Sequence, residues 1–244
     1  MTRREEQLLR EHFGDGEKYE EAARRLRSGE PLAYILGEWY FWRYTFKVTP
    51  DVLVPQPDTE ILVERAIKLL PHGGRLLDLC TGSGCIACSV LADRSDASGD
   101  AVDISQPAVE IARINAAALG LDGRLCIKVG DVLSDSCGSE CGSERCDLIV
   151  ANPPYIRSNI IPTLSPQVRA EPHIALDGGE SGLRFYEGII AKYPSQLTQG
   201  GRMLLEIGYD QAESVRELAR RAGLHCDILR DYGGNDRVAE LYCD

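Results

Sequence analysis

The first 30 residues carry apolar side chains at helical spacing between charged ones. This pattern predicts helices over residues 3–13 and 17–26, which Gly14 and Gly16 interrupt. Two short helices cannot bury a core of their own. We therefore expect this helical N-terminal segment, residues 1–30, to pack against another part of the chain.

Residues 31–57 change to an aromatic pattern with high β-propensity. Pro31, Gly37 and Pro50 divide this segment, and the run from residue 38 to residue 48 contains most of its aromatic side chains. Such a run between turn-forming residues predicts a β-hairpin. The hairpin would link the N-terminal segment to the remainder of the chain.

From residue 58 onward, short apolar runs alternate with helical patterns. A helix with Asp58 or Thr59 as its cap is expected to run to about Leu70. Strands are predicted over residues 75–79, 101–104, 125–129, 147–151, 203–207, 226–229 and 238–242. Helices are predicted over residues 84–91, 105–120, 183–193 and 211–222, with a turn at Gly200 and Gly201.

This alternation predicts an α/β fold. Helical crossovers between successive strands are typical of parallel pairing, whereas the short connection between the last two strands requires an antiparallel pair. We therefore expect a doubly wound, mainly parallel seven-stranded sheet with one reversed strand, in a domain over residues 58–244.

Composition and charge narrow the function classes. Hydrophobic residues make up 43% and charged residues 27% of the chain, as in ordinary globular domains. No apolar run reaches the roughly 18 residues of a membrane span, and the charged N-terminus does not resemble a secretory signal, so we expect a cytoplasmic protein without membrane contact. The formal net charge of −11 disfavours a broad nucleic-acid-binding surface.

The nine cysteines give no disulfide or metal pattern. We expect most of them to be buried free thiols, which behave as small hydrophobic residues; these are Cys80, Cys85, Cys88, Cys126 and Cys226. Cys137, Cys141 and Cys146 lie in a Gly/Ser-rich segment without paired Cys-x-x-Cys spacing or a nearby histidine. A flexible insertion without a metal is the simpler interpretation of that segment.

A glycine-containing loop between the first strand and its helix predicts a ligand site. In the segment 78–84, Gly82 and Gly84 allow the backbone to turn tightly beside a helix N-terminus. Residues 82–87 also fit the dinucleotide pattern G-x-G-x-x-A. At this point both NAD and S-adenosylmethionine are possible ligands.

Residues after the second and third strands also suit a nucleoside. Asp103 ends the second strand, where a carboxylate can accept both hydrogen bonds of a ribose diol. After the third strand, Asp131 can accept from an adenine amino group while Val132 packs on the ring. An ordinary capping role for Asp131 is nearly as good an interpretation.

The segment Asn152-Pro-Pro-Tyr155 directly follows the fourth strand. Its chemistry discriminates between NAD and S-adenosylmethionine as the expected ligand. Its prolines remove two N–H donors, so the turn presents oxygens. The Asn152 side-chain oxygen and the Pro153 carbonyl can each accept a hydrogen from a planar NH₂ group, and the Tyr155 ring can pack on its face. Such acceptors stabilise the positive charge that grows on an attacked amide nitrogen, which favours methyl transfer over hydride transfer.

These motifs resemble the HemK/PrmC family of protein-(glutamine) methyltransferases. The resemblance runs from about Pro31 to the C-terminus. It rests on residues 31–37, 54–60, 78–84, 152–155 and 171–179. It implies the Rossmann-like fold of class I S-adenosylmethionine-dependent methyltransferases. It also implies methyl transfer to the side-chain amide of the Gly-Gly-Gln glutamine in class I peptide chain release factors, with S-adenosylhomocysteine as product.

The resemblance also implies site roles. The substrate glutamine would be held by Asn152, Pro153, Pro154 and Tyr155, of which Asn152, Pro153 and Tyr155 would take part in catalysis. The cofactor would be held by Cys80, Thr81, Gly82, Ser83, Gly84, Asp103, Asp131, Val132 and Asn152. No metal is implied, and the expected partner is a class I release factor.

This sequence departs from the family pattern in three places. Cys80 replaces the first glycine of the loop, and Pro-Gln-Pro-Asp at residues 55–58 replaces Pro-Arg-Pro-Glu. The resemblance also implies that the helical N-terminal segment, truncated to about 30 residues, is shorter than the family's N-terminal domain, which would help to dock the release factor. Two alternatives remain: a methyltransferase for a nucleic-acid base amine, and a non-catalytic paralogue that binds S-adenosylmethionine.

Overall fold

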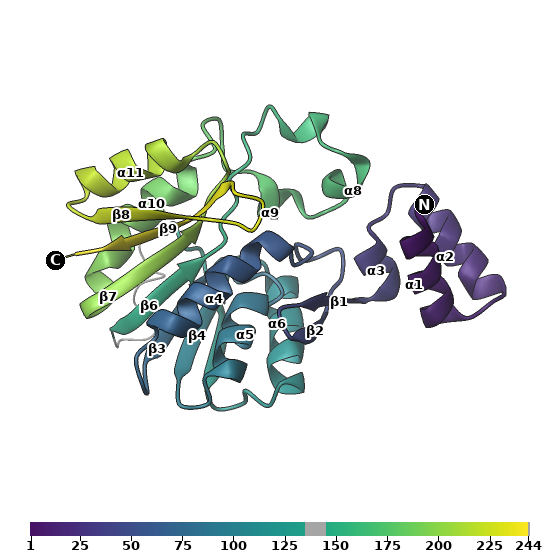
Figure 1. Ribbon diagram of the computed structural model, residues 1–244, viewed down its shortest axis with the longest axis horizontal. Coiled ribbons are helices and arrows are strands. Elements are labelled where there is room, and N and C mark those ends of the chain that lie inside the picture. The colour runs from purple at the N-terminus through teal and green to yellow at the C-terminus, as the bar shows by residue number, and fades with distance from the viewer. Residues whose placement is uncertain (135–144, 244) are drawn as a thin grey trace.

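In the computed structural model, which describes residues 1–134 and 145–243, seven strands form one sheet in the order β5-β4-β3-β6-β7-β9-β8 (Figure 1). The strands are β3 (Arg75–Leu79), β4 (Ser98–Asp103), β5 (Leu125–Val129), β6 (Cys146–Ala151), β7 (Leu197–Glu206), β8 (His225–Arg230) and β9 (Asp236–Tyr242). Strands β5, β4, β3, β6 and β7 are mutually parallel, and β9 runs antiparallel to β7 and β8. The predicted mainly parallel sheet with one reversed strand is confirmed.

Helices cover both faces of the sheet because its strands are apolar on both sides. Along β6, Leu148 and Val150 face one core, while Ile149 and Ala151 face the other. The first core is closed by α4 (Glu60–Leu69), α5 (Cys85–Asp93) and α6 (Gln106–Ala118). The second is closed by α10 (Arg184–Lys192) and α11 (Ala212–Arg221). The fold is therefore doubly wound.

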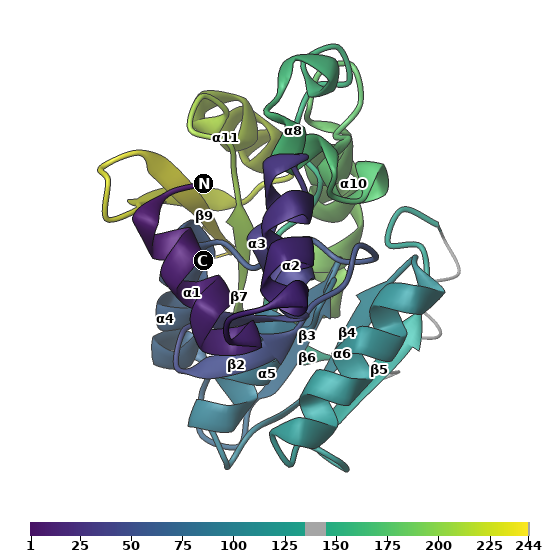
Figure 2. The same cartoon turned by 90° about the vertical axis from the view of Figure 1, so that its right-hand side faces the viewer.

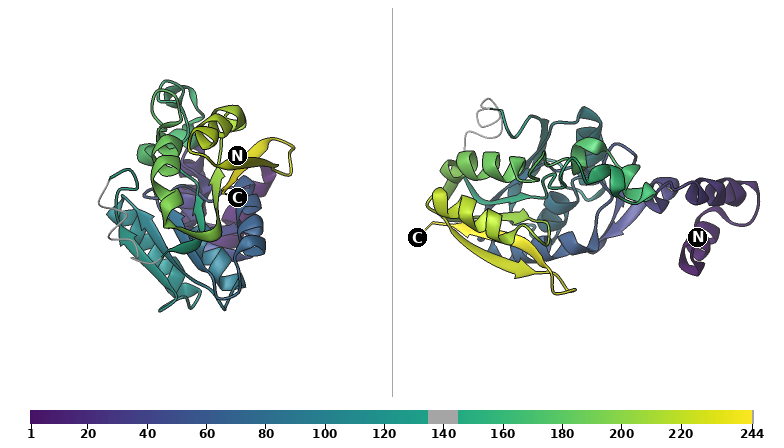
Figure 3. Two further views of the ribbon diagram at one scale, coloured as in Figure 1. Left: turned by 90° about the vertical axis from the view of Figure 1, so that its left-hand side faces the viewer. Right: turned by 90° about the horizontal axis from the view of Figure 1, so that it is seen from above.

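Three N-terminal helices extend from one end of the molecule (Figure 3, right), the end that faces the viewer in Figure 2. They are α1 (Arg3–Phe13), α2 (Glu17–Arg27) and α3 (Leu32–Leu36), and they share a small core that includes Leu9, Tyr19 and Ile35. The sequence interpretation placed residues 32–36 in the linker, whereas they are helical. Five residues are too few to show helical periodicity, although Pro31 before the helix and left-handed Gly37 after it are typical boundaries.

The predicted hairpin is confirmed and docks on α6. Strands β1 (Glu38–Phe41) and β2 (Tyr44–Lys47) pair antiparallel. The buried Asn115 side chain on α6 accepts from the Lys47 N–H at 2.7 Å and donates to the Lys47 carbonyl at 3.0 Å. It also donates to the Ser83 carbonyl at 2.8 Å, so one side chain joins the hairpin to the loop that follows β3.

Two local predictions need correction. Thr59 occupies the cap position of α4, but its side chain makes no capping hydrogen bond there, because it faces the Asn152 side chain instead. The turn predicted at Gly200 and Gly201 lies inside β7, where the register with β6 shifts. A glycine pair interrupts the ladder at this point without ending the strand.

The cysteines are less uniformly buried than expected. Cys85 and Cys88 are buried, as predicted, whereas Cys126 is exposed because it alternates with the core residue Ile127 on the edge strand β5. Cys146 is a buried residue of β6 and so does not belong to the insertion. Cys137 and Cys141 lie outside the described residues.

Within the described residues, 1–134 and 145–243, no group of three or more His, Cys, Asp or Glu side chains is arranged to hold a metal ion. None of their helices combines the length and the apolar character that a membrane crossing requires.

The remaining short helices are η1 (Pro57–Thr59), η2 (Ile161–Thr163), α8 (Pro166–Arg169), α9 (His173–Leu176) and η3 (Tyr193–Gln196).

Removing the Asn115 side chain should loosen the hairpin. In Asn115→Ala, three backbone groups of Lys47 and Ser83 lose their partner, so we expect the free energy of unfolding to fall by about 2–4 kcal/mol in urea titrations. Gln106→Ala changes an exposed residue of the same helix and should alter stability by no more than about 0.5 kcal/mol. Equal losses in the two variants would contradict the docking role of Asn115.

Candidate active site

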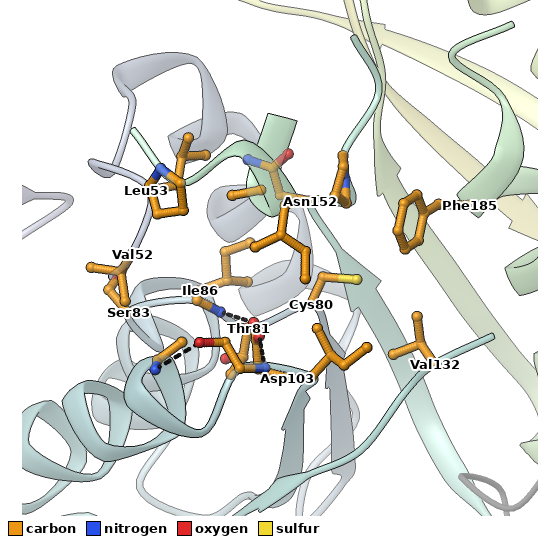
Figure 4. Close-up of a pocket in the computed structure, with 18 of the residues that line it drawn as sticks. Val52, Leu53, Cys80, Thr81, Ser83, Ile86, Asp103, Val132, Asn152 and Phe185 are labelled. Carbon is orange, nitrogen blue, oxygen red and sulfur yellow. Dashed lines mark hydrogen bonds between the residues drawn. The ribbon is translucent and has the colours of Figure 1, made fainter. Parts of the chain in front are cut away.

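The ends of four parallel strands meet at one cavity of about 240 Å³ (Figure 4). Ligands of open parallel sheets bind at this carboxyl edge. The cavity residues that directly follow a strand, or end it, are Cys80, Thr81, Gly82 and Ser83 after β3, Asp103, Ile104 and Ser105 at β4, Gly130, Asp131, Val132 and Leu133 after β5, and Asn152 and Pro154 after β6. The structure thus brings most of the predicted site residues together.

A buried carboxylate shapes the loop after β3. The Asp78 side chain accepts from the Thr81 hydroxyl at 2.7 Å and from the Ala87 N–H at 3.2 Å. Burial raises the pKa of Asp78 to about 7, although these two hydrogen bonds lower it. Asp78 belongs to the predicted ligand loop, but its structural role there is not evident from the sequence.

Two residues of this loop, Cys80 and Gly84, were predicted to contact the cofactor, and the structure shows other constraints on each of them. Cys80 has φ +58°, in the left-handed region that favours glycine, so the cysteine occupies a conformation that its side chain disfavours. Gly84 is not among the cavity residues. A Cβ at Gly84 would lie 3.1 Å from that of Ala112, so this glycine permits the close approach of α5 and α6. The cofactor contacts predicted for Cys80 and Gly84 remain predictions.

Asp103 lies at the floor of the cavity and holds the loop in place (Figure 4). Its carboxylate accepts from the Gly82 N–H at 2.8 Å and from the Ser105 N–H at 2.9 Å. Burial raises its pKa despite these backbone hydrogen bonds. Each oxygen keeps a second acceptor position. Beside it, Ile104 leaves 50% of its surface exposed at the cavity, which provides an apolar face next to an acceptor.

The residues after β5 have a local role as well. Asp131 accepts from the Leu133 N–H at 2.8 Å, as a turn cap would. Val132 is buried and lines the cavity near Phe185 of α10 (Figure 4). Phe185 could not be predicted as a site residue, because only tertiary packing brings the first turn of α10 to this cavity.

The turn after β6 divides its side chains between the cavity and the interior. Asn152 and Pro154 line the cavity, and the Asn152 side chain donates to the Thr59 hydroxyl at 3.3 Å. Pro153 and Tyr155 are not among the cavity residues. The Tyr155 ring packs on the second core and its hydroxyl donates to Glu206 at 3.4 Å. Stacking of Tyr155 on a substrate amide therefore remains a prediction.

A further wall of the cavity, outside the sheet, is formed by side chains from residues 51–56 and 172–175. The Tyr34 hydroxyl donates to the Val52 carbonyl at 2.6 Å, and the Glu171 carboxyl accepts from the Val54 N–H at 2.9 Å. Gln56 lies on this wall and donates to the Val54 carbonyl at 2.9 Å. Three separate sequence segments are thereby joined around one edge of the cavity.

Comparison with known proteins identifies the family. The chain is 42% identical to the release factor glutamine methyltransferase of Cereibacter sphaeroides over 223 residues, which cover 91% of this chain and 77% of that relative. The chain belongs to the release factor glutamine methyltransferase family. A relative from Moorella thermoacetica with the same name is 39% identical and covers 99% of this chain and 84% of its own length.

Two further comparisons support the fold of this release factor glutamine methyltransferase family member. The family model described as "Methyltransferase small domain" matches residues 56–163. The solved structure of a methyltransferase from Pyrococcus furiosus matches with a TM-score of 0.62 at 15% identity, covering 91% of this chain and 96% of that chain. The expected class I methyltransferase fold is confirmed, and the chain is a methyltransferase.

The Glu171 carboxyl, which accepts from the Val54 N–H beside the cavity, should make the stability of the folded chain depend on pH. Burial raises its pKa from 4.5 to about 7, although the Val54 N–H lowers it. Between these values the folded state binds more protons than the unfolded state, so this group's contribution to stability falls as pH rises through the window. We expect Glu171→Gln to reduce the difference in urea midpoint between mildly acidic and mildly alkaline buffer.

The matched control is Glu180→Gln, which changes an exposed carboxyl of the same segment. The control should keep the wild-type difference in urea midpoint. An unchanged difference in Glu171→Gln would contradict the assignment of this titration to Glu171.

Proposed function

We propose that this chain transfers a methyl group from S-adenosylmethionine to the side-chain amide nitrogen of the Gly-Gly-Gln glutamine in a class I peptide chain release factor. One observation carries the proposal. Asn152 lines the same cavity as Asp103, and the Asn152 amide nitrogen is already bonded to Thr59. Its side-chain oxygen is left to accept from a substrate. Membership of the family supports the choice of a release factor.

The residues present fit the cofactor. A ribose needs acceptors for two hydroxyls, and the Asp103 carboxylate retains acceptor positions. An adenine ring needs apolar faces, and exposed Ile104 and cavity-lining Val132 offer them. Asp131 would accept from the adenine amino group, and the loop over residues 80–83 would hold the methionine part. When bound, S-adenosylmethionine supplies a methyl group that is already activated on a positively charged sulfur.

The chain's own contribution is to align and stabilise the amide. An amide nitrogen is a weak nucleophile because its lone pair is delocalised into the carbonyl. The Asn152 side-chain oxygen and the Pro153 carbonyl would accept its two hydrogens and stabilise the positive charge that grows on nitrogen. Pro153 and Pro154 contribute no N–H donor that would oppose this charge. The wall over residues 51–56 and 172–175 would limit the access of water.

Methyl transfer tests the proposal directly. Labelled S-adenosylmethionine should transfer its methyl group to a purified class I release factor. The label should be absent when the Gly-Gly-Gln glutamine is replaced by alanine, because no acceptor nitrogen remains. Label in DNA or RNA, with none in the release factor, would instead establish a base-amine methyltransferase. A lack of transfer to any of these substrates would contradict the proposal.

Two variants should separate substrate from cofactor handling. Asn152→Ala removes an acceptor from the reacting nitrogen, so we expect kcat to fall by about 100-fold or more, with little change in cofactor affinity by calorimetry. Asp103→Asn replaces a carboxylate oxygen with a donor and should weaken cofactor binding about tenfold. Equal effects of both variants on cofactor binding would contradict these roles.

A further inference from the structure

The side chain of Gln211 holds the far end of the turn that follows β6. Gln211 directly precedes α11 and is only 6% exposed. Its amide nitrogen donates to the Tyr155 carbonyl at 3.0 Å and to the Gly182 carbonyl at 3.1 Å. Its amide oxygen accepts from the Gly208 N–H at 2.9 Å and from the Tyr186 hydroxyl at 3.2 Å. All four hydrogen-bonding positions of this buried carboxamide are therefore used.

The partners of Gln211 allow only one orientation of its carboxamide. Backbone carbonyls only accept hydrogen bonds, and a backbone N–H only donates. The Gln211 nitrogen must therefore face Tyr155 and Gly182, and its oxygen must face Gly208. A flipped carboxamide would place its oxygen against two carbonyls and its nitrogen against an N–H, which leaves buried groups without partners at a large cost in free energy.

The turn over residues 152–155 depends on its two ends for its direction. Pro153 and Pro154 have no N–H, and their rings fix φ, so the centre of the turn is rigid and donates no hydrogen bond of its own. At the first end, β6 holds the turn, because Ala151 is paired with Leu205 of β7. The second end lies beyond the strand and needs other partners.

Contacts from later parts of the chain hold this second end. The Ile156 N–H donates to the Leu176 carbonyl at 3.0 Å, and the Ile156 carbonyl accepts from the Gly178 N–H at 2.8 Å. A Cβ at Gly178 would lie 2.8 Å from the Tyr155 Cα, so the two backbones are in close contact. Gln211 adds a side chain from the loop after β7, which ties the Tyr155 carbonyl to that loop.

We propose that Gln211 is a positioning residue that fixes the direction in which residues 152–155 present the Asn152 side chain and the Pro153 carbonyl to the substrate. This inference rests on the proposed function and deepens it. Gln211 is not among the cavity residues, so it acts through the Tyr155 carbonyl and not on the reacting atoms. Because methyl transfer tolerates little misplacement of the attacking nitrogen, a turn released at its far end should lose turnover and keep cofactor affinity.

Replacement of Gln211 by methionine tests this role. Gln211→Met keeps the approximate length of the side chain and removes all four hydrogen bonds. We expect kcat to fall by about tenfold or more, with KM for S-adenosylmethionine within about threefold of the wild type. KM should be retained because Asp78 and Asp103 hold the cofactor loop separately.

Tyr186→Phe is the contrasting variant on the oxygen side of the same carboxamide. The Tyr186 hydroxyl divides its hydrogen between the Gln211 oxygen and the Glu206 carbonyl. Its removal leaves both bonds from the Gln211 nitrogen in place, so kcat should stay within about threefold of the wild type. An equal fall of kcat in Tyr186→Phe and Gln211→Met would contradict a role that acts through Tyr155.

Arg124→Met is the matched control for lost stability. The Arg124 side chain donates to the carbonyls of Leu91, Arg94 and Ala97 at 3.0, 3.2 and 2.9 Å. It directly precedes β5 and so lies at the edge of the sheet opposite the cavity. This variant should lower the urea midpoint, as Gln211→Met does, and keep kcat within about threefold. A tenfold fall of kcat here would show that lost stability alone explains the effect of Gln211→Met.

Gln211→Glu is a second variant that decides the question if Gln211→Met does not fold. A carboxyl keeps an acceptor for the Gly208 N–H and for the Tyr186 hydroxyl, but it has at most one hydrogen for the carbonyls of Tyr155 and Gly182. We expect kcat to fall at least about threefold with an unchanged KM for S-adenosylmethionine. An unchanged kcat in the folded Gln211 variants would overturn the proposal.

A measurement without catalysis separates this inference from the proposed function. In the free ¹⁵N-labelled protein, the Asn152 side-chain NH₂ signals can be assigned by their loss in Asn152→Asp. We expect them to shift in the folded Gln211 variants and to stay in place in Arg124→Met. If they shift in this way but the wild type transfers no methyl group, the proposed function fails and the positioning role stands. If they do not shift, the positioning role is wrong, whether or not methyl transfer occurs.

Discussion

Parallel pairing of β3 with both β4 and β6 is the constraint on which the site depends. The register aligns Leu79 with Val102 on one side and with Ala151 on the other. Because parallel strands point the same way, the residues that follow these three positions emerge at one edge of the sheet. Cys80, Asp103 and Asn152 thus meet at one cavity although they are far apart in the sequence.

The same edge contains carboxyl groups whose burial opposes their ionisation. Burial raises the pKa of both Asp78 and Glu206 to about 7. Asp78 binds the loop after β3, and Glu206 binds Tyr155 in the turn after β6. In each case the ionised form is the one that accepts these hydrogen bonds most strongly, whereas burial disfavours that form. Order in the site is therefore obtained at some cost to the stability of the folded chain.

The sequence was most informative about features that depend on a single strand and the residue after it, such as the bounds of a strand and the site residue at its end. The apolar runs gave β3 and β5 with their observed bounds, and they placed Asp103 and Asn152 at strand ends. Side-chain directions within the turns could not be predicted, because packing against α4 and β7 sets them. Tyr155 turns inward to Glu206 for this reason. Phe185 lies in a predicted helix, but no local pattern shows that this helix reaches the cavity. Helix α3, with five residues, is too short to show helical periodicity.

The cavity wall formed by residues 51–56 and 172–175 is held by contacts from other parts of the chain. Tyr34 and Glu171 each hold a backbone group of residues 52–54, and Gly29 approaches Pro166 so closely that a Cβ there would lie 3.1 Å from the proline Cβ. The N-terminal helices, the linker and the segment before α10 therefore form one connected surface beside Asn152. The proposed choice of a glutamine amide over other planar NH₂ groups would therefore depend on this connected surface. Asn152 itself would accept hydrogens from an amide or a base amine equally well.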